Sequence, residues 1–478
     1  MSSELLAPLD LAFWHLETTD HPMHLGALAF FDGGPDGCDG VLELLAERAA
    51  AIPRLRVRVR DVLLPVGGAA WRVHDSFDVR RHVRRLRVPG GDFTAGAVAL
   101  AGELMERPLE RGLPPWEMYL LTGAADRDGD SEGEGDGGPG PGTRTGPGAR
   151  PGDEAPVARP FAVLVKLHHA LADGMRAVAI GAGIFDEIAG ARTARAAGRR
   201  RPRAAPPRTR LPGPWDIAGA ARGRVAEIGR AFGIGASVVR AGRLDAPGAP
   251  ALTADPSGTR RLAVTALDLD EVRRVRRAAG GTANDVLLTV VAGALRRWML
   301  ERGDRLPDAD PRALVPVSRR RPGAPPGGGN EFSAYLLDLP LRDDDPLGRL
   351  AAVRRAMDRN KAAGPARGAG AVALLAGQLP PLAHRFGAPL AGGAARVLFD
   401  VLVTNVPLPR SALSLGGRPL RALYPMAPLA RGQALAVAMS PYGDRVHIGL
   451  VADGRALPDV DGLADAARAE LAELLRAV

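Results

Sequence analysis

The chain has 478 residues, of which 46% are hydrophobic and 24% charged, and its formal net charge is +9 at pH 7. This length exceeds what a single hydrophobic core usually supports, so we expect two domains. Nearly all of the positive charge is arginine, only 4% of the residues are aromatic, and no DNA- or RNA-binding motif accompanies the charge, so we expect no nucleic-acid partner. The single cysteine, Cys38, excludes an internal disulfide framework.

The first 123 residues mix helical and strand-like patterns. Residues 41–52 (VLELLAERAAAI) have helical spacing, whereas residues 54–60 (RLRVRVR) alternate arginine with leucine or valine, which is typical of a strand with one solvated face. The first ten residues lack a basic stretch followed by an apolar core, so we expect no secretory signal and a cytoplasmic location.

The composition changes sharply at residues 124–159, which contain almost no large apolar side chains and many glycines, prolines and charges. Such a segment cannot repay the entropy of ordering, and we expect a disordered insertion. It separates residues 115–121 (PWEMYLL) from residues 161–167 (FAVLVKL), both of which have the pattern of strands. The insertion is therefore expected to loop out from a sheet.

The most informative feature is the HHxxxDG string at His168, His169, Asp173 and Gly174. It lies between the apolar strand at residues 161–167 and an Ala-rich segment, 174–188, that has helical spacing. Asp173 stands where that helix would begin, so its carboxylate is suited to cap free backbone N–H groups and to hold the loop that aims His169. A strand-to-helix junction of this kind faces a cleft, where functional side chains collect.

A neutral imidazole has an ordinary pKa of about 6.5, so it accepts a proton at cellular pH and returns it later. His169 could therefore deprotonate a hydroxyl as it attacks a thioester carbonyl, then protonate the departing thiolate, which indicates acyl transfer. His21 and His24 lack the spaced partners of a zinc site, and we expect no metal. The remaining histidines are interpreted as structural: His15, His74, His82, His384 and His447.

The second part of the chain begins after a basic linker at residues 196–213. Residues 214–244 form a basic amphipathic pattern, which suits either a helix on a membrane surface or a crossover helix packed on the second domain. A new strand pattern starts near Arg260. We therefore divide the chain into an N-terminal domain at 1–190, a linker with crossover helix at 191–258 and a C-terminal domain at 259–478.

No apolar stretch reaches the 18 or more uninterrupted residues of a membrane-spanning helix. Residues 286–295 are too short. Residues 369–393 are rich in alanine, leucine and glycine but include prolines and charges, so we expect a core or interfacial helix there.

Sequence blocks along nearly the whole chain resemble the bacterial wax ester synthase/diacylglycerol acyltransferase family. Besides HHALADG they are PLD near the start, PPWEMYLL, TANDVLL, VPVS, GNEFS, TNVPLP and the closing run from LYPMAPLARG to GLVAD. Chloramphenicol acetyltransferases, plant acyl-CoA transferases and peptide-synthetase condensation domains resemble the chain mainly at HxxxDG. The resemblance implies an α/β fold of the chloramphenicol-acetyltransferase type, with a mixed sheet in each half and an active-site tunnel between them.

The same resemblance assigns roles to individual residues. It implies that His169 is the general base, that His168 and Asp173 support its geometry, and that Gly174 allows the tight turn. Asn284 and Asp285 head an apolar helix, where they either cap the helix or shape the tunnel. The other polar candidates, Asn330, Ser333 and Asn405, either hold an acyl carbonyl or are turn residues. The remaining family matches are Pro8, Leu9 and Asp10; Pro115 (the family usually has Leu here), Trp116 and Glu117; Asn330 and Ser333; and Asn405, Val406 and Pro407.

The reaction implied is transfer of a long-chain acyl group from acyl-CoA to diacylglycerol or a fatty alcohol, with no cofactor. We expect peripheral contact with a membrane or lipid droplet. Two alternatives stay open. One is an enzyme of the same fold that acts on a carrier-bound acyl group, a polyketide alcohol or an amine. The other is a non-catalytic lipid-binding protein that has kept the fold.

Overall fold

A computed structural model describes residues 4–33, 38–123, 159–186, 249–318, 332–363 and 398–478. The predicted insertion at 124–159, except residue 159, lies outside these ranges, as do Asn330, the linker at 196–213 and the segments at 214–244 and 369–393.

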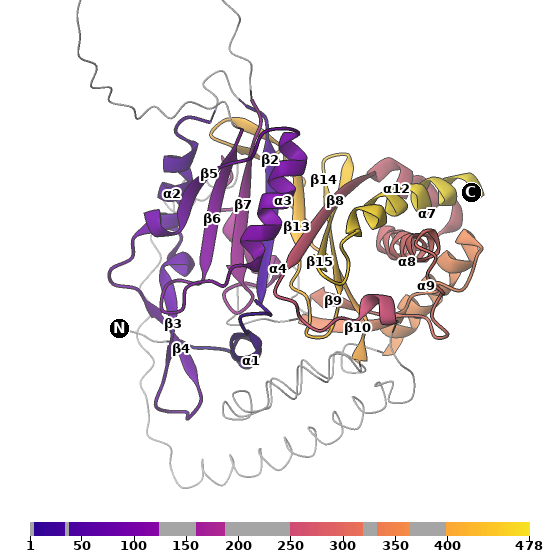
Figure 1. The fold of residues 1–478 in the computed structure, drawn as a ribbon, viewed down its shortest axis with the longest axis horizontal. Coiled ribbons are helices and arrows are strands. Elements are labelled where there is room, and N and C mark those ends of the chain that lie inside the picture. The colour runs from indigo at the N-terminus through magenta and orange to yellow at the C-terminus, as the bar shows by residue number, and fades with distance from the viewer. Residues whose placement is uncertain (1–3, 34–37, 124–158, 187–248, 319–331, 364–397) are drawn as a thin grey trace, which may run out of the picture.

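Two six-stranded mixed sheets lie side by side (Figure 1). In the first sheet only β5 and β6 are parallel. Its order is β12 (Ser414–Leu415), β13 (Arg418–Met426), β2 (His24–Phe31), β7 (Phe161–His168), β6 (Trp116–Thr122) and β5 (Val83–Arg87). In the second sheet β11 is parallel to both of its neighbours. That order is β10 (Phe332–Asp338), β9 (Arg312–Ser318), β11 (Val401–Asn405), β14 (Leu435–Tyr442), β15 (Arg445–Asp453) and β8 (Arg260–Asp268).

The C-terminal half contributes two strands to the first sheet. Strands β12 and β13 belong by sequence to the predicted C-terminal domain at 259–478, but they complete the first sheet, where β13 pairs with β2. Burial stabilises this arrangement, because Leu415, Leu420 and Leu423 pack in the hydrophobic core of the first half. A domain boundary at residue 259 does not predict that β12 and β13 join the first sheet.

The strands predicted on either side of the insertion are confirmed as β6 and β7. They are antiparallel neighbours, with Trp116 opposite Leu167 and Leu121 opposite Ala162. The chain between them therefore joins adjacent strand ends. The helix predicted at residues 41–52 is confirmed as α2 (Val41–Ala51).

The prediction of a strand at residues 54–60 is partly wrong. The segment begins as a 3-10 turn, η1 (Pro53–Arg56), and only β3 (Val57–Asp61) is extended. Pro53 occupies the first helical position, where its fixed φ favours a turn, and Leu55 is fully buried. β3 joins β4 (Ala69–Val73) and β1 (Glu4–Leu5) in a separate three-stranded sheet.

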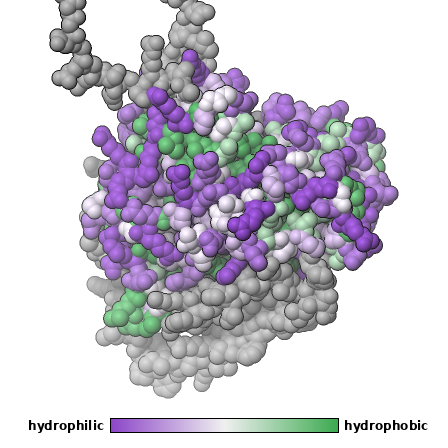
Figure 2. Space-filling view, in the orientation of Figure 1, coloured by the Kyte–Doolittle hydropathy of each residue, from purple (hydrophilic) through white to green (hydrophobic). Residues whose placement is uncertain are grey.

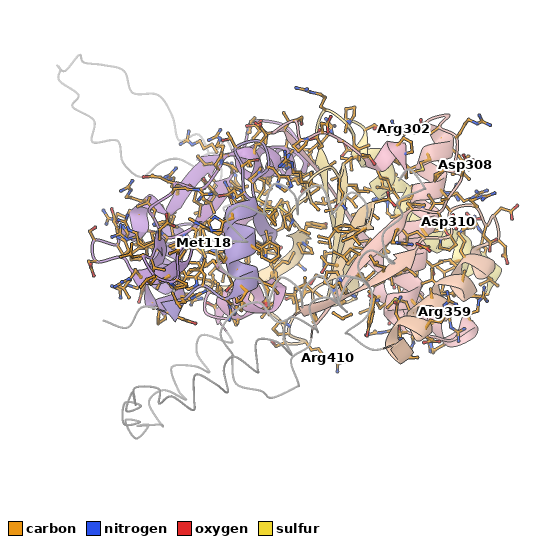
Figure 3. The ribbon with its side chains drawn as sticks, turned by 90° about the horizontal axis from the view of Figure 1, so that it is seen from below. Met118, Arg302, Asp308, Asp310, Arg359 and Arg410 are labelled. Carbon is orange, nitrogen blue, oxygen red and sulfur yellow. The ribbon has the colours of Figure 1, made fainter. Side chains whose placement is uncertain are left out.

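Helices cover the second sheet on its outer side and one helix lies at the junction of the halves (Figure 1). The outer helices are α7 (Leu269–Ala279), α8 (Ala283–Glu301), α9 (Pro346–Ala363) and α12 (Val460–Ala477). At the junction, α3 (Phe93–Glu106) contacts β8, and residues of both sheets share one core cluster with it. Figure 3 shows the halves from below, with Met118 in the first and Arg302, Asp308 and Asp310 at the far end of the second.

Among the described residues, no single helix has the length and hydropathy of a membrane span, although α7 and α8 together pass that test across a bend of 103°.

Candidate active site

The HHxxxDG segment lies at the predicted strand-to-helix junction. β7 ends at His168, and α4 (Gly174–Gly181) begins six residues later. Asp173 caps α4, as the sequence predicts, because its Oδ1 accepts a hydrogen bond from the backbone N–H of Arg176 at 2.7 Å. The helix is shorter than the predicted 174–188: it ends at Gly181, and a turn that contains a second glycine, Gly183, follows.

The loop between β7 and α4 is held by hydrogen bonds at its start. The backbone N–H of His169 donates to the Met23 carbonyl at 2.8 Å, and that of Leu171 donates to the His168 carbonyl at 2.9 Å. The N–H of Ala170 donates to Nδ1 of His168 at 3.0 Å. These bonds fix the direction in which His169 leaves the strand.

His168 is fully buried and acts through its neighbours. Because Nδ1 accepts the Ala170 N–H, the proton of the neutral ring is on Nε2. This Nε2 lies 3.4 Å from Oε1 of Glu17, which follows helix α1 (Pro8–Leu16). His168 therefore links the loop on one side to Glu17 on the other.

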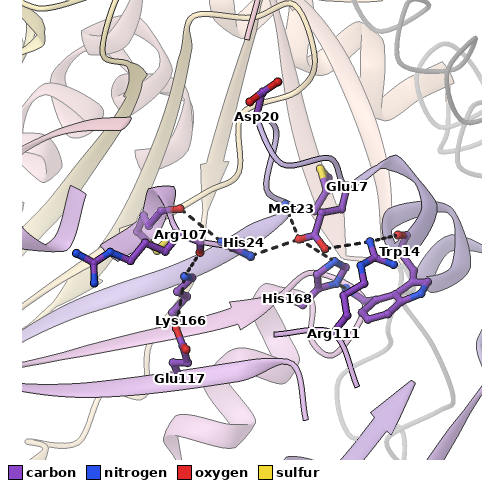
Figure 4. Close-up of polar contacts among 12 residues, drawn as sticks. Trp14, Glu17, Asp20, Met23, His24, Arg107, Arg111, Glu117, Lys166 and His168 are labelled. Atoms are coloured by element: carbon purple, nitrogen blue, oxygen red, sulfur yellow. Dashed lines mark hydrogen bonds and ion pairs between the residues drawn. The ribbon is translucent and has the colours of Figure 1, made fainter. Parts of the chain in front are cut away.

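Glu17 is a functional candidate that the sequence analysis missed. Its Oε1 lies 3.3 Å from Nε2 of His24, and its Oε2 lies 3.2 Å from Nη2 of Arg111 (Figure 4). Burial alone would raise the pKa of this carboxyl, but hydrogen bonds from His168 and His24 lower it well below its usual range. Glu17 is therefore a buried carboxylate at neutral pH.

A second buried charge stands beside this network. Lys166 interrupts the apolar pattern of β7, and its Nζ donates to the carbonyl of Leu104 at 2.8 Å and to that of Arg107 at the end of α3. Nζ also lies 3.5 Å from Oε2 of Glu117. Burial lowers the pKa of Lys166 to about 8, although Glu117 opposes the shift. The lysine fastens β7 to the carboxyl end of α3.

His169 lies in the wall of a cavity. Its side chain is partly exposed, and its ring centroid lies 4.0 Å from that of Phe13 on α1. Burial lowers the pKa of His169 from 6.5 to about 4, and the charge of Asp173 opposes the shift only in part. The exposed part of the ring thus faces the cavity and not bulk water. At neutral pH the imidazole is uncharged and able to accept a proton.

The cavity has a volume of about 710 Å³ and is lined by both halves. The first half contributes Phe13, Leu25 and Met118, and the second contributes Leu314, Val315 and Leu402, among others. Most of its wall is apolar. Among the described residues its polar side chains are His169, Asp173, Asn284, Thr404, Asn405 and Ser440.

Two of the predicted residues meet in this wall. Nδ2 of Asn405, the last residue of β11, donates to Oδ1 of Asn284 near the start of α8 at 3.3 Å, although the two are 121 positions apart. The chain after β11 is also held, because Oγ of Ser440 donates to the Val406 carbonyl at 2.7 Å. The hydrogen bond between Asn405 and Asn284 fixes two amides beside the cavity that His169 faces.

Asp285 has a structural position. Its Oδ2 accepts from the N–H of Thr282 at 2.7 Å, while Oγ1 of Thr282 accepts from the N–H of Asp285 at 3.2 Å. This reciprocal capping box begins α8, so the N-cap is Thr282 and neither Asn284 nor Asp285. Asp285 does not line the cavity, and Asn284 does.

Pro115 and Trp116 do not line the cavity either. Trp116 is fully buried, its Nε1 donates to the Leu55 carbonyl at 2.7 Å, and its ring stacks on that of His82. The Pro115 carbonyl accepts from the N–H of His168 at 3.0 Å. Both residues support β6 and β7, and Met118, two residues further along, reaches the cavity.

Gly174 has a role other than the predicted tight turn. Its φ angle is not positive, so the backbone conformation at this position does not require glycine. Its side of the helix faces Val406, and a Cβ at this position would lie 3.3 Å from Val406 Cγ2. Glycine is therefore suited to a close approach between α4 and the chain after β11.

The remaining family blocks are partly described. Pro8 begins α1, and Asp10 is buried with its Oδ2 3.9 Å from Nη1 of Arg176. The PLD block thus starts the helix that carries Phe13 against His169. Ser333 belongs to β10, but its side chain, like Asn330, is outside the described part of the chain.

The two mixed sheets, with the histidine loop at a cavity between them, define the fold class of this chain, which solved structures share. The fold matches a starter condensation domain of rhizomide synthetase, solved with C8-CoA and Leu-SNAC, at a TM-score of 0.55 and 16% identity over 100% of this chain and 95% of that one. It also matches a wax ester synthase/diacylglycerol acyltransferase from Marinobacter aquaeolei VT8 at a TM-score of 0.65 and 24% identity over 98% of each chain. The predicted α/β fold with two mixed sheets is confirmed.

The chain belongs to the wax ester synthase/diacylglycerol acyltransferase family, as the resemblance predicted. The profile of the wax ester synthase/diacylglycerol acyltransferase catalytic domain matches residues 6–128 and 158–287, and that of the WS/DGAT C-terminal domain matches residues 328–475. A probable diacylglycerol O-acyltransferase of Mycobacterium tuberculosis (strain H37Rv) is 30% identical over 96% of this chain and 93% of its own length. A second from the same strain is 29% identical over 99% of both.

Proposed function

We propose that this chain transfers a long-chain acyl group from acyl-CoA to the hydroxyl of a diacylglycerol or a fatty alcohol, with His169 as general base. The products are a triacylglycerol or a wax ester and free coenzyme A. The observation that carries the proposal is the position of the His169 imidazole in the wall of an apolar cavity to which both halves contribute.

The reaction needs one proton to move twice. His169 takes the proton of the acceptor hydroxyl while the hydroxyl oxygen attacks the thioester carbonyl carbon. The carbon–sulfur bond then breaks, and the imidazolium gives the proton to the thiolate of coenzyme A. The depressed pKa of His169, about 4, keeps the ring neutral before the reaction and makes the imidazolium a strong acid for the second transfer.

The cavity wall is suited to binding apolar substrates. Its polar side chains are few, and an acyl chain or a fatty alcohol loses contact with water on entering it. The paired amides of Asn284 and Asn405 are neutral groups suited to hold a carbonyl oxygen as negative charge develops on it. Because acceptors of this kind are held in membranes or lipid droplets, we also propose that the enzyme works at such a surface.

The test is a panel of acceptors offered to the purified protein with labelled acyl-CoA. Diacylglycerol, a fatty alcohol and a fatty amine are supplied separately, and release of coenzyme A thiol is followed together with mass spectrometry of the neutral lipids. We expect a labelled triacylglycerol, a wax ester or both, and no amide.

Two results overturn the proposal. Amide formation without ester formation would assign the chain to acyl transfer onto nitrogen, as in an enzyme of the same fold with another acceptor. Binding of acyl-CoA and acceptor with no product from any member of the panel would assign it to non-catalytic lipid binding.

A further inference from the structure

The hairpin of β3 and β4 exposes a group of large apolar side chains at its tip. The turn at residues 62–68 (VLLPVGG) leaves Leu63 89%, Leu64 75% and Val66 55% exposed. Figure 2 shows the resulting hydrophobic patch at the lower left, where Figure 1 has the end of this hairpin. Folding gains nothing from large apolar groups in water, and such patches mark interaction sites.

Arginines flank the apolar tip on one face of the hairpin. Arg58 and Arg72 are directly opposite each other in the antiparallel pair, and Arg60 is two residues along from Arg58. Opposed residues share a face, as do residues two apart, so the three arginines lie on the same face. The half-buried Arg58 donates to the Gly112 carbonyl at 3.3 Å, whereas Arg60 and Arg72 are exposed. The other face is buried through Val59 and Trp71. With Asp61 as its one carboxylate, the hairpin at 57–73 has three arginines and one acid, a formal charge of +2.

The shape of this feature favours a lipid surface over a protein. The exposed apolar residues form a convex tip at one tight turn, and a stable protein interface needs about 800 Å² from each partner. Leucine and valine side chains that enter the acyl region, with arginines behind them at the level of the headgroups, match the chemistry of an anionic bilayer surface.

The hairpin is also connected to the candidate active site. β4 pairs with β1 through Leu5 and Ala70, and β1 leads within three residues into α1. α1 carries Phe13, whose ring lies against that of His169. Contact of the hairpin with a membrane would thus hold the helix beside the catalytic histidine close to the surface that contains apolar acceptors.

We infer that the tip of the β3–β4 hairpin, at Leu63, Leu64 and Val66, inserts into an anionic phospholipid surface, with the exposed Arg60 and Arg72 against the headgroups. The proposal concerns binding and does not depend on acyl transfer. It is tested without an acyl donor, so that its failure and the failure of the proposed function are separate results.

The test is co-sedimentation of the full chain with vesicles of phosphatidylcholine alone or of phosphatidylcholine mixed with phosphatidylglycerol. We expect stronger binding to the mixed vesicles. The double variant Leu63→Ser/Leu64→Ser should lower the partition coefficient roughly a hundredfold, because each inserted leucine contributes about a factor of ten. Arg60→Gln/Arg72→Gln should lower binding to the mixed vesicles roughly tenfold or more and leave binding to phosphatidylcholine unchanged.

Leu300→Ser is the matched control, because Leu300 is 48% exposed at the end of α8 in the other half. It should bind like the unmodified protein. As a second measurement, an environment-sensitive fluorophore on Leu63→Cys should shift to shorter wavelength on mixed vesicles, and one on Leu300→Cys should not. Unchanged binding of the double leucine variant, or no vesicle binding by the unmodified protein, would overturn the inference.

Discussion

Nε2 of His168 lies 3.4 Å from Oε1 of Glu17, and both side chains are buried. The contact joins the loop of the histidine pair to the end of helix α1, whose Phe13 ring lies against that of His169. The first histidine of the motif thus holds the second in place through a carboxylate from a distant part of the chain.

This relationship predicts that Glu17 controls the rate more than the affinity for substrate. In Glu17→Ala, His168 loses its acceptor and His24 and Arg111 lose their carboxylate, so the loop that carries His169 is released. We expect kcat to fall roughly tenfold to hundredfold, in line with the loss of a hydrogen bond to a buried charge. The KM for acyl-CoA should change little, because Glu17 does not line the cavity.

Glu17→Gln is the matched variant for this prediction. It keeps an oxygen that can accept from Nε2 of His168, so part of the activity should return. Equal losses of kcat in the Ala and Gln variants would show that the charge and not the hydrogen bond matters, and an unchanged kcat in both would contradict a positioning role.

The amide pair in the cavity wall predicts coupled effects of two substitutions. Asn284→Ala and Asn405→Ala should each lower kcat about tenfold, because each leaves the other amide without its orienting hydrogen bond. In a double-mutant cycle the two losses should not add, so the double variant is expected to resemble either single one. Kinetics of the four proteins with one acyl-CoA and one acceptor measure this, and fully additive losses would show that the amides act separately.

The close approach of α4 to the chain after β11 predicts a suppressor pair. Gly174→Ala places a Cβ 3.3 Å from Val406 Cγ2, so α4 or residue 406 must move by a few tenths of an ångström. We expect a several-fold loss of activity, because residue 406 follows Asn405 in the cavity wall. Val406→Ala should restore activity when combined with Gly174→Ala. If the double variant is no better than Gly174→Ala alone, this contact is not the reason for glycine.

Buried histidines predict that stability falls on the acid side of neutrality. Burial lowers the pKa of His21, His24, His169 and His447 from 6.5 to about 4 in the folded chain. The unfolded chain therefore binds more protons between these values, so stability is complete above pH 6.5 and is lost as the pH falls toward 4. Each histidine contributes about 1–2 kcal/mol to the loss between pH 7 and pH 5.

Urea unfolding at pH 7 and pH 5 measures this loss. His447 does not itself line the cavity, and its ring packs between those of Tyr424 and Tyr442. His447→Phe keeps an aromatic ring there and removes one titrating group, so its stability should fall less between the two pH values. Equal unfolding midpoints at pH 7 and pH 5 for the unmodified protein would contradict the prediction.

Local features of this chain could be predicted from the sequence. The period of the apolar residues indicated β6, β7 and α2, and the position of Asp173 before an Ala-rich segment indicated the cap of α4. The placement of His169 followed from the same local pattern, because a residue between a buried strand and a helix comes to the edge of a sheet.

Features that depend on distant parts of the chain could not be predicted in this way. Glu17 is separated from His168 by more than a hundred residues, and nothing near it in the sequence indicates a buried acid. The same is true of β13, whose apolar residues would suit either sheet. Lys166 did give a signal, since a lysine in an apolar strand needs buried partners, but those partners are carbonyls at the end of α3.

The central claim is that the imidazole of His169 moves the proton during acyl transfer. It is tested most directly by the turnover of His169→Ala with acyl-CoA and acceptor at pH 7, with acyl-CoA affinity measured in parallel and His74→Ala, outside the cavity wall, as the control. We predict that kcat of His169→Ala falls roughly 10²–10⁴-fold while affinity and fold are retained. Turnover close to that of the unmodified protein would contradict the account.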